Sequence, residues 1–308
     1  MTTVSDVNTA PPVDPAKTEL APVSPTRPFT WSVRREMWEN RSIVFGPLIA
    51  AGVVLLGWLL GALHSPHVKF NVSGADAGSQ AFVLIAPYGF AAGAVLVTGV
   101  IVGAFYCLGA LHNERRDRSI LFWKSLPVSD LTTVLSKASI PLIVLPVILL
   151  AVIIATQVIL LMLGAVAALS GSSPMPWTRL PILQMWLVLL YGLTAMSLWY
   201  APIWAWLLLV SVWARRAPFL WAVLPPLALC VVERIAFDTG HLATLLKQRL
   251  GGLDRAFADR VQPATPYDFL PRIDAARFFG TPDVWVGLAV AAALIAGAVW
   301  LRRSREPI

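Results

Sequence analysis

The chain has 308 residues, of which 57% are hydrophobic and 13% are charged, and its mean hydropathy is +0.71. Soluble domains usually carry about 25% charged residues, so this composition excludes a soluble protein and places most of the chain in a lipid bilayer. The formal charge is +7, but the basic residues lie beside apolar segments rather than in a patch with interleaved aromatic residues. This distribution argues against nucleic acid as a partner and favours lipid headgroups.

The N-terminal part of the chain divides into a tail and a candidate helix. Residues 1–28 contain six prolines and only scattered hydrophobic residues, which predicts a disordered cytosolic tail. In residues 29–41, the apolar Phe29, Val33 and Met37 recur every four residues, which predicts an amphipathic helix in the membrane interface. Its candidate interfacial residues are Trp31, Arg34, Arg35 and Trp38, with Glu36 and Glu39 expected on the polar side together with the two arginines.

Six apolar segments follow, at about residues 43–63, 88–111, 140–169, 182–212, 219–235 and 284–301. Each is near or above the roughly 20 residues that cross a bilayer core. The fourth contains Pro202, and because the part after this proline is too short to span, we expect one long, kinked helix. The fifth is short and contains Pro225 and Pro226, so a five-span arrangement stays an alternative. The predicted fold class is an all-α polytopic membrane protein with six transmembrane helices, formed by residues 29–308.

Lysine and arginine in short loops predict the orientation, because these residues resist translocation. They are concentrated before span one, between spans two and three, after span four and after span six, which predicts that both termini are cytosolic. The loop 236–283 breaks this pattern with six basic residues, but long loops follow the rule less strictly. We therefore expect this loop outside the cytosol, with a short amphipathic helix at 241–250 that ends at Gly251 and Gly252.

The segment LHNERRDRSILFWKSLPVSDLTTVLSK, residues 111–137, is the most informative stretch. It begins with charges, continues with an apolar cluster at 120–123, turns at Pro127 and restarts with Ser129 or Asp130 placed as a helix N-cap. An exposed apolar cluster between charges needs cover from lipid headgroups or from another protein. The segment is therefore either an interfacial loop or a docking element for a cytosolic partner.

The run ERRDRSILFWKSLPVSD, after the second span of a six-span chain, resembles the permeases of ABC-2 type transporters. Glu114 and Arg115 match the acidic–basic pair of that family, and Ser125, Leu126 and Pro127 match its small–Leu–Pro step. The resemblance implies a cytosolic coupling helix between spans two and three that docks on a separate ATP-binding subunit. The residues that it implies for coupling are Glu114, Arg115, Asp117, Ser119, Phe122, Trp123, Lys124, Ser125, Leu126, Pro127 and Asp130.

The same resemblance implies an exporter in the bacterial plasma (inner) membrane, built from two permeases that are copies or paralogues. The chain holds no GxxxxGK[ST] loop, so we expect ATP and magnesium on the partner ATPase and neither catalysis nor a cofactor or metal in this chain. A non-transporting anchor or regulator that recruits a cytosolic partner is the alternative. An intramembrane enzyme is disfavoured, because no acid, base or metal-ligand constellation converges on the spans.

Polar groups inside the expected spans bear on the energy source. The ionisable residues there are Glu233 and Arg234, which we interpret as an interfacial pair closing span five rather than an ion-coupling site. Thr156 and Gln157 in span three are expected to form hydrogen bonds between helices. Energy is therefore expected to enter from outside the membrane.

Glycine and aromatic residues complete the sequence pattern. Three pairs of glycines four residues apart predict close helix packing, chiefly within the chain; they are Gly57 and Gly61, Gly89 and Gly93, and Gly99 and Gly103. The aromatic residues of span four favour a lipid-like or amphiphilic, drug-like cargo; they are Trp186, Trp199, Tyr200, Trp204 and Trp206.

Overall fold

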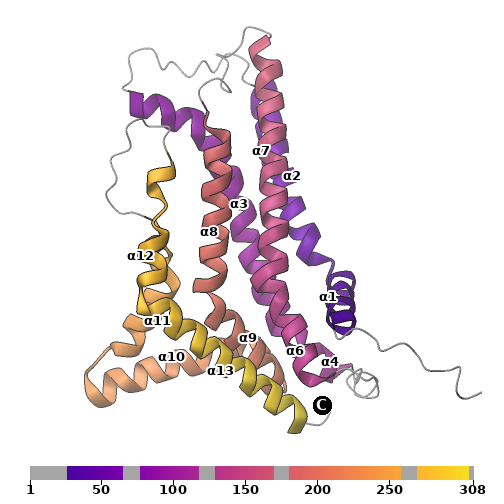
Figure 1. The fold of residues 1–308 in the computed structure, drawn as a ribbon, viewed down its shortest axis with the longest axis vertical. Coiled ribbons are helices and arrows are strands. Elements are labelled where there is room, and N and C mark those ends of the chain that lie inside the picture. Colours follow the sequence, from indigo (N-terminus) through magenta and orange to yellow (C-terminus); the bar gives the residue numbers. More distant parts are fainter. Residues whose placement is uncertain (1–25, 65–76, 118–128, 170–179, 258–268, 305–308) are drawn as a thin grey trace, which may run out of the picture.

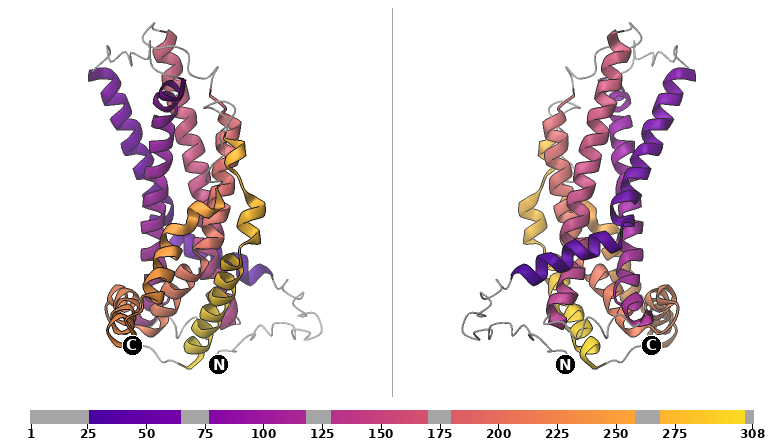
Figure 2. Two further views of the ribbon diagram at one scale, coloured as in Figure 1. Left: turned by 90° about the vertical axis from the view of Figure 1, so that its left-hand side faces the viewer. Right: turned by 90° about the vertical axis from the view of Figure 1, so that its right-hand side faces the viewer.

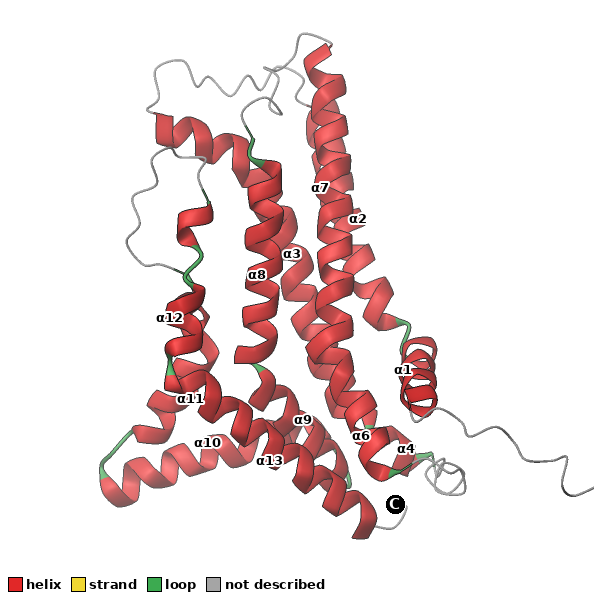
Figure 3. Ribbon diagram, in the orientation of Figure 1, coloured by secondary structure: helices red, strands yellow, loops and turns green. Residues whose placement is uncertain are grey.

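A computed structural model describes residues 26–64, 77–117, 129–169, 180–257 and 269–304. Within these ranges the chain is almost entirely helical, and the one β contact is an isolated bridge between Phe257 and Ile273 (Figure 3). The expectation of an all-α membrane protein is confirmed. The tail 1–25 lies outside the described residues, and the first helix, α1, begins at Thr26 rather than at Phe29 and ends at Glu39.

Six helical stretches of the described chain are long and apolar enough to cross a membrane. The third is continuous from Asp130 to Leu169, because a short π-helical turn joins α6 to α7. The helices that form the six stretches are α2 (Ser42–His64), α3 (Ala77–Ala110), α6 (Asp130–Ser139) with η2 (Ile140–Val144) and α7 (Leu145–Leu169), α8 (Ile182–Trp199), α10 (Pro218–Phe237) and α13 (Pro282–Ser304).

The expected single helix 182–212 is wrong, because the chain breaks at Tyr200 and forms α8 and a separate helix α9 (Ala201–Trp213). Pro202 occupies the first turn of α9, where its missing N–H leaves no hydrogen bond unmade. The backbone N–H groups of Ile203 and Trp204 both donate to the Tyr200 carbonyl, which starts the new helix. With 13 residues, α9 is too short to cross a bilayer alone.

The helices α7 and α8, and α3 after its first part, run along the long axis of the molecule (Figure 1). We call the end that carries α1, the short helix α4 (His112–Arg116) and the C-terminal end of α13 the basal end. Both side views show α10 lying across this basal end rather than along the other long helices (Figure 2). Span five thus has the length and composition of a crossing helix but a different direction from its neighbours.

The centre of the bundle is formed by α3, which packs against α2, α7 and α9. Its core includes Val95 of α3, Leu149 and Ile153 of α7, and Leu208 of α9, all fully or almost fully buried. Gly99 permits this packing, since a Cβ atom there would overlap the Leu149 side chain.

The three expected glycine pairs behave differently. At Gly103 an added Cβ would press on Leu145 and Trp204, so the pair Gly99 and Gly103 supports helix packing within the chain. The other two pairs, Gly57 with Gly61 and Gly89 with Gly93, face open space.

The described part of segment 238–283 packs along α8. The backbone carbonyl of Arg249, in α11 (His241–Gly251), accepts a hydrogen bond from Trp199 Nε1 at 2.8 Å. Further along, Tyr191 donates to the Ala256 carbonyl, and Gln184 accepts from the Phe269 backbone N–H. The helix expected at 241–250 is present, with one more residue at its end, but its leucines are exposed rather than packed on one buried face.

The Arg249 side chain of α11 contacts both α8 and α13. Its guanidinium lies 4.5 Å from the centre of the Trp199 ring and donates to the Asp283 carbonyl at 3.0 Å. Burial lowers the pKa of Arg249, and Asp283 opposes this shift. Gly287 of α13 leaves room for the guanidinium, since a Cβ atom there would overlap it.

Glu233 and Arg234 are expected from the sequence to act as a pair at the end of span five. In the structure each has its own partner instead. The Glu233 carboxylate accepts hydrogen bonds from the backbone N–H groups of His241 and Leu242 at 2.8 Å, so it caps the first turn of α11. Arg234 lies 3.6 Å from Asp238. Both residues close the turn between α10 and α11, which agrees with a structural role.

Candidate functional site

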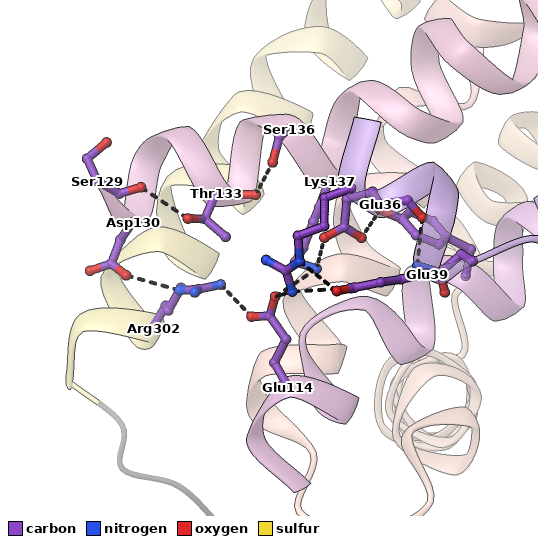
Figure 4. Close-up of polar contacts among 12 residues, drawn as sticks. Glu36, Glu39, Glu114, Ser129, Asp130, Thr133, Ser136, Lys137 and Arg302 are labelled. Atoms are coloured by element: carbon purple, nitrogen blue, oxygen red, sulfur yellow. Dashed lines mark hydrogen bonds and ion pairs between the residues drawn. The ribbon is translucent and has the colours of Figure 1, made fainter. Parts of the chain in front are cut away.

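The basal end contains a buried cluster of charged side chains that comes from α1, α4, α6 and α13 (Figure 4). Within the described residues, its centre is a set of ion pairs between three carboxylates and three cations. The carboxylates are Glu36, Glu114 and Asp130, and the cations are Arg35, Lys137 and Arg302. Buried charges are costly unless each one has a partner, so this arrangement marks the cluster as the candidate functional site.

Glu114 is the centre of the cluster. It lies in α4, one turn after α3 ends, and its side chain is 8% exposed. One carboxylate oxygen is 3.1 Å from Lys137 Nζ and 3.8 Å from Arg35 Nη2, and the other is 3.0 Å from Arg302 Nη1. A single carboxylate therefore joins α4 to three other helices.

Lys137 links Glu114 to α1. Its Nζ atom is 2.7 Å from Glu36 Oε1, and both side chains are almost fully buried, at 2% and 3% exposed. The Tyr106 hydroxyl of α3 donates to the other oxygen of Glu36 at 2.9 Å. The expectation that Glu36 lies on the polar, outward side of α1 is therefore wrong, since α1 packs this residue against α6 and α3.

The outer face of α1 carries three of the expected interfacial residues, Trp31, Arg34 and Trp38, whereas Arg35 faces the cluster. Trp31 and Trp38 are 65% and 68% exposed, and the Arg34 guanidinium lies 5.8 Å and 5.1 Å from the centres of their rings. Arg35 forms an ion pair with Glu39 at 2.6 Å, one turn further on. Exposed tryptophans with a neighbouring arginine are typical of helices that lie at a membrane interface, which is the position expected for α1.

Asp130 and Arg302 close the cluster at the start of α6. The Ser129 hydroxyl accepts a hydrogen bond from the Thr132 backbone N–H, so Ser129, one of the two expected candidates, is the N-cap. Asp130 instead occupies the first turn and accepts from Arg302 Nε at 3.0 Å. Arg302 thereby binds the carboxylates of both Asp130 and Glu114.

Two contacts fix the other side of α4 to the end of α9. The buried Arg115 donates to the Val212 carbonyl, and the His112 ring is 3.1 Å from the Ala214 carbonyl. These carbonyls lie at the C-terminal end of α9, where a helix leaves backbone oxygens without internal partners. The helix α4 is consequently held on both sides.

The residues expected to couple to an ATPase thus fall into three groups. Glu114 and Arg115 are buried, and Asp130 is partly buried against Arg302. Asp117 is exposed and pairs with the neighbouring Arg116. Seven others, Ser119, Phe122, Trp123, Lys124, Ser125, Leu126 and Pro127, lie in residues 118–128, outside the described residues.

Four members of the site were not singled out from the sequence: Glu36, Tyr106, Lys137 and Arg302. The sequence spacing could have indicated Lys137, because it follows Asp130 by seven residues in a helix and so lies on the same side of α6. The burial of Glu36 depends on Tyr106 and Lys137, which are 70 and 101 residues away in sequence. Contacts over such separations are not visible in a local pattern.

At mid-span the described polar contacts are neutral. Gln157 of α7 accepts a hydrogen bond from Trp186 Nε1 of α8 at 2.9 Å, and its amide nitrogen is 3.5 Å from the Tyr88 carbonyl of α3. The expected hydrogen bonds between helices at Gln157 are therefore present. Thr156 donates to the Val152 carbonyl within its own helix.

No family model matches this chain, and searches of curated proteins and of solved structures find no match.

Proposed function

We propose that this chain is the membrane-spanning permease subunit of an ATP-binding cassette exporter, driven by a separate cytosolic ATPase that docks on residues 118–128. The observation that carries the proposal is the pairing of Glu114 with Lys137. These residues lie on either side of the expected docking segment, in α4 and α6, and both belong to the buried charge cluster.

This arrangement suits the transmission of movement from a docked partner. A buried ion pair resists separation, because removing one partner leaves an uncompensated charge at a cost of about 3–5 kcal/mol. Displacement of segment 118–128 would therefore carry α4 and α6 together. Through Glu36 and Arg302, it would also reach α1 and α13.

The neutral contacts at mid-span fit an external energy source. The hydrogen bonds of Gln157 join three helices without an ionisable side chain. Ion-driven transporters place their coupling-ion sites near this depth. Among the described residues at this depth, Gln157 joins helices instead.

The aromatic residues of the fourth span do not support a particular cargo, because their side chains have partners within the chain. Trp186, Trp199, Tyr200 and Trp206 donate hydrogen bonds to Gln157, Arg249, Leu250 and Ala222, respectively. Trp204 is buried against α3. A lipid-like or amphiphilic cargo stays an expectation from composition alone.

Copurification tests the proposal. Tagged protein would be extracted from its native membrane in mild detergent, and we expect an ATP-binding subunit to accompany it and to hydrolyse ATP. The variant Trp123→Ala/Leu126→Ala should lose this subunit, whereas Trp38→Ala, an exposed tryptophan of α1, should keep it. Recovery of a partner that does not bind ATP would instead support an anchor or regulator, and loss from both variants would place docking elsewhere.

A further inference from the structure

An open groove of about 410 Å³ lies along the outer side of the contact between α6 and α13. Leu131 and Leu135, one turn apart on α6, form one wall of this groove. Ala292, Ala296 and Trp300, spaced four residues apart on α13, line the other wall. The small alanine side chains leave the space between the helices unfilled, and the lining in this region is apolar.

A single charged residue, Arg303, lines the same groove. Its neighbour Arg302 is 4% exposed and turned toward Asp130 and Glu114, whereas Arg303 is exposed. Successive residues of an α-helix point about 100° apart, which places the two guanidinium groups on different sides of α13. Within the part of the chain that the structure describes, no carboxylate pairs with Arg303.

We propose that this groove binds an anionic phospholipid, with an acyl chain between α6 and α13 and the phosphate at Arg303. The apolar walls match the chain, and the guanidinium supplies the charge that a phosphate requires. Basic residues between membrane helices on the cytoplasmic side are suited to anionic headgroups. Trp300, 68% exposed, provides an amphipathic ring of the kind found at headgroup depth.

The charge at Arg303 favours a lipid over a second copy of this chain. A second apolar helix in the groove would cover the guanidinium without a counter-charge, which is costly. The lipid would also stabilise the contact of α6 with α13, next to the bond between Asp130 and Arg302. This binding does not require the proposed ATPase.

Thermal unfolding of the full-length chain tests the proposal. Protein depleted of lipid in a neutral detergent would be mixed with phosphatidylglycerol or with phosphatidylcholine of the same acyl chains. Since a ligand that binds only the folded state stabilises it, we expect a larger rise in Tm with phosphatidylglycerol. Arg303→Gln should remove this excess, whereas Arg216→Gln, an equal charge change at an exposed site, should keep it.

Titration by native mass spectrometry gives the affinity. Arg303→Gln should weaken phosphatidylglycerol binding about fivefold, the effect of one arginine near an anionic surface. Ala296→Phe, which fills the groove but keeps the charge, should weaken it as well. Equal stabilisation by the two lipids, or an unchanged phosphatidylglycerol preference in Arg303→Gln, would overturn the proposal, as would lipid-independent dimers that dissociate on the Ala296→Phe substitution.

Discussion

Glu114 of α4 and Lys137 of α6 meet at 3.1 Å, although residues 118–128 lie between them in the chain. The pair is buried, and each member has a second partner of opposite charge, Arg302 for Glu114 and Glu36 for Lys137. Ion pairs of Glu114 and Lys137 therefore join α1, α4, α6 and α13. The proposed coupling depends on this ion pair between Glu114 and Lys137.

Lys137→Met should strongly destabilise the protein. The substitution keeps the volume of the side chain but leaves Glu36 and Glu114 without the cation that both contact. Loss of one member of a buried ion pair lowers the free energy of unfolding by about 3–5 kcal/mol. Denaturant unfolding in detergent, followed by tryptophan fluorescence, measures the change.

The matched control is Arg116→Met, since Arg116 carries the same charge but is 66% exposed and, among the described residues, pairs with the adjacent Asp117 alone. Exposed pairs contribute about 0–1 kcal/mol. A loss of the same size in both variants, or a stable Lys137→Met protein, would show that the cluster does not hold the basal end together.

Hydropathy was enough to predict the apolar spans and the all-α fold, because a bilayer requires about 20 apolar residues in each crossing helix. It was not enough to place Glu36, which has the neighbours of a surface residue in sequence yet is buried by contacts with Tyr106 and Lys137. Ser129 was predictable as a cap, since that contact is local. The break at Tyr200 was missed because Pro202 permits either a kink or a helix start.

Gly99→Val should destabilise the bundle by about 1–3 kcal/mol, the usual cost of overpacking a core. A side chain at this position would collide with the buried Leu149 of α7. Gly57→Val is the control, because Gly57 also lies in a membrane helix but has open space around its Cα. Thermal unfolding of the two variants should differ clearly, and equal midpoints would contradict the packing of α3 on α7.

Gly287→Ala should release α11 from α8. The added methyl group would occupy the space of the Arg249 guanidinium and force it away from Trp199. We expect faster hydrogen exchange in 241–251, with Arg249→Met giving the same effect. The control Gly280→Ala, where a Cβ meets nothing within 4 Å, should leave the exchange unchanged. Unaltered exchange in Gly287→Ala would argue against this attachment.

The direction of α10 gives a topological prediction. Because α10 lies across the basal end, we expect its two ends on one side of the membrane, although the sequence predicts opposite sides (Figure 1). Single cysteines at Arg216 and Asp238, in a background without Cys107 and Cys230, would be labelled with an impermeant reagent. Labelling of both from one side supports the arrangement of the structure, and labelling from opposite sides supports a crossing span five.

Photo-crosslinking from position 123 in native membranes tests the central claim most directly. A photoreactive residue in place of Trp123 should form an adduct with an ATP-binding subunit, and the same residue in place of Trp31 should not. The adduct would place an ATPase on segment 118–128, as the permease account requires. Adducts with lipid alone at position 123, in protein that is inserted normally, would contradict it.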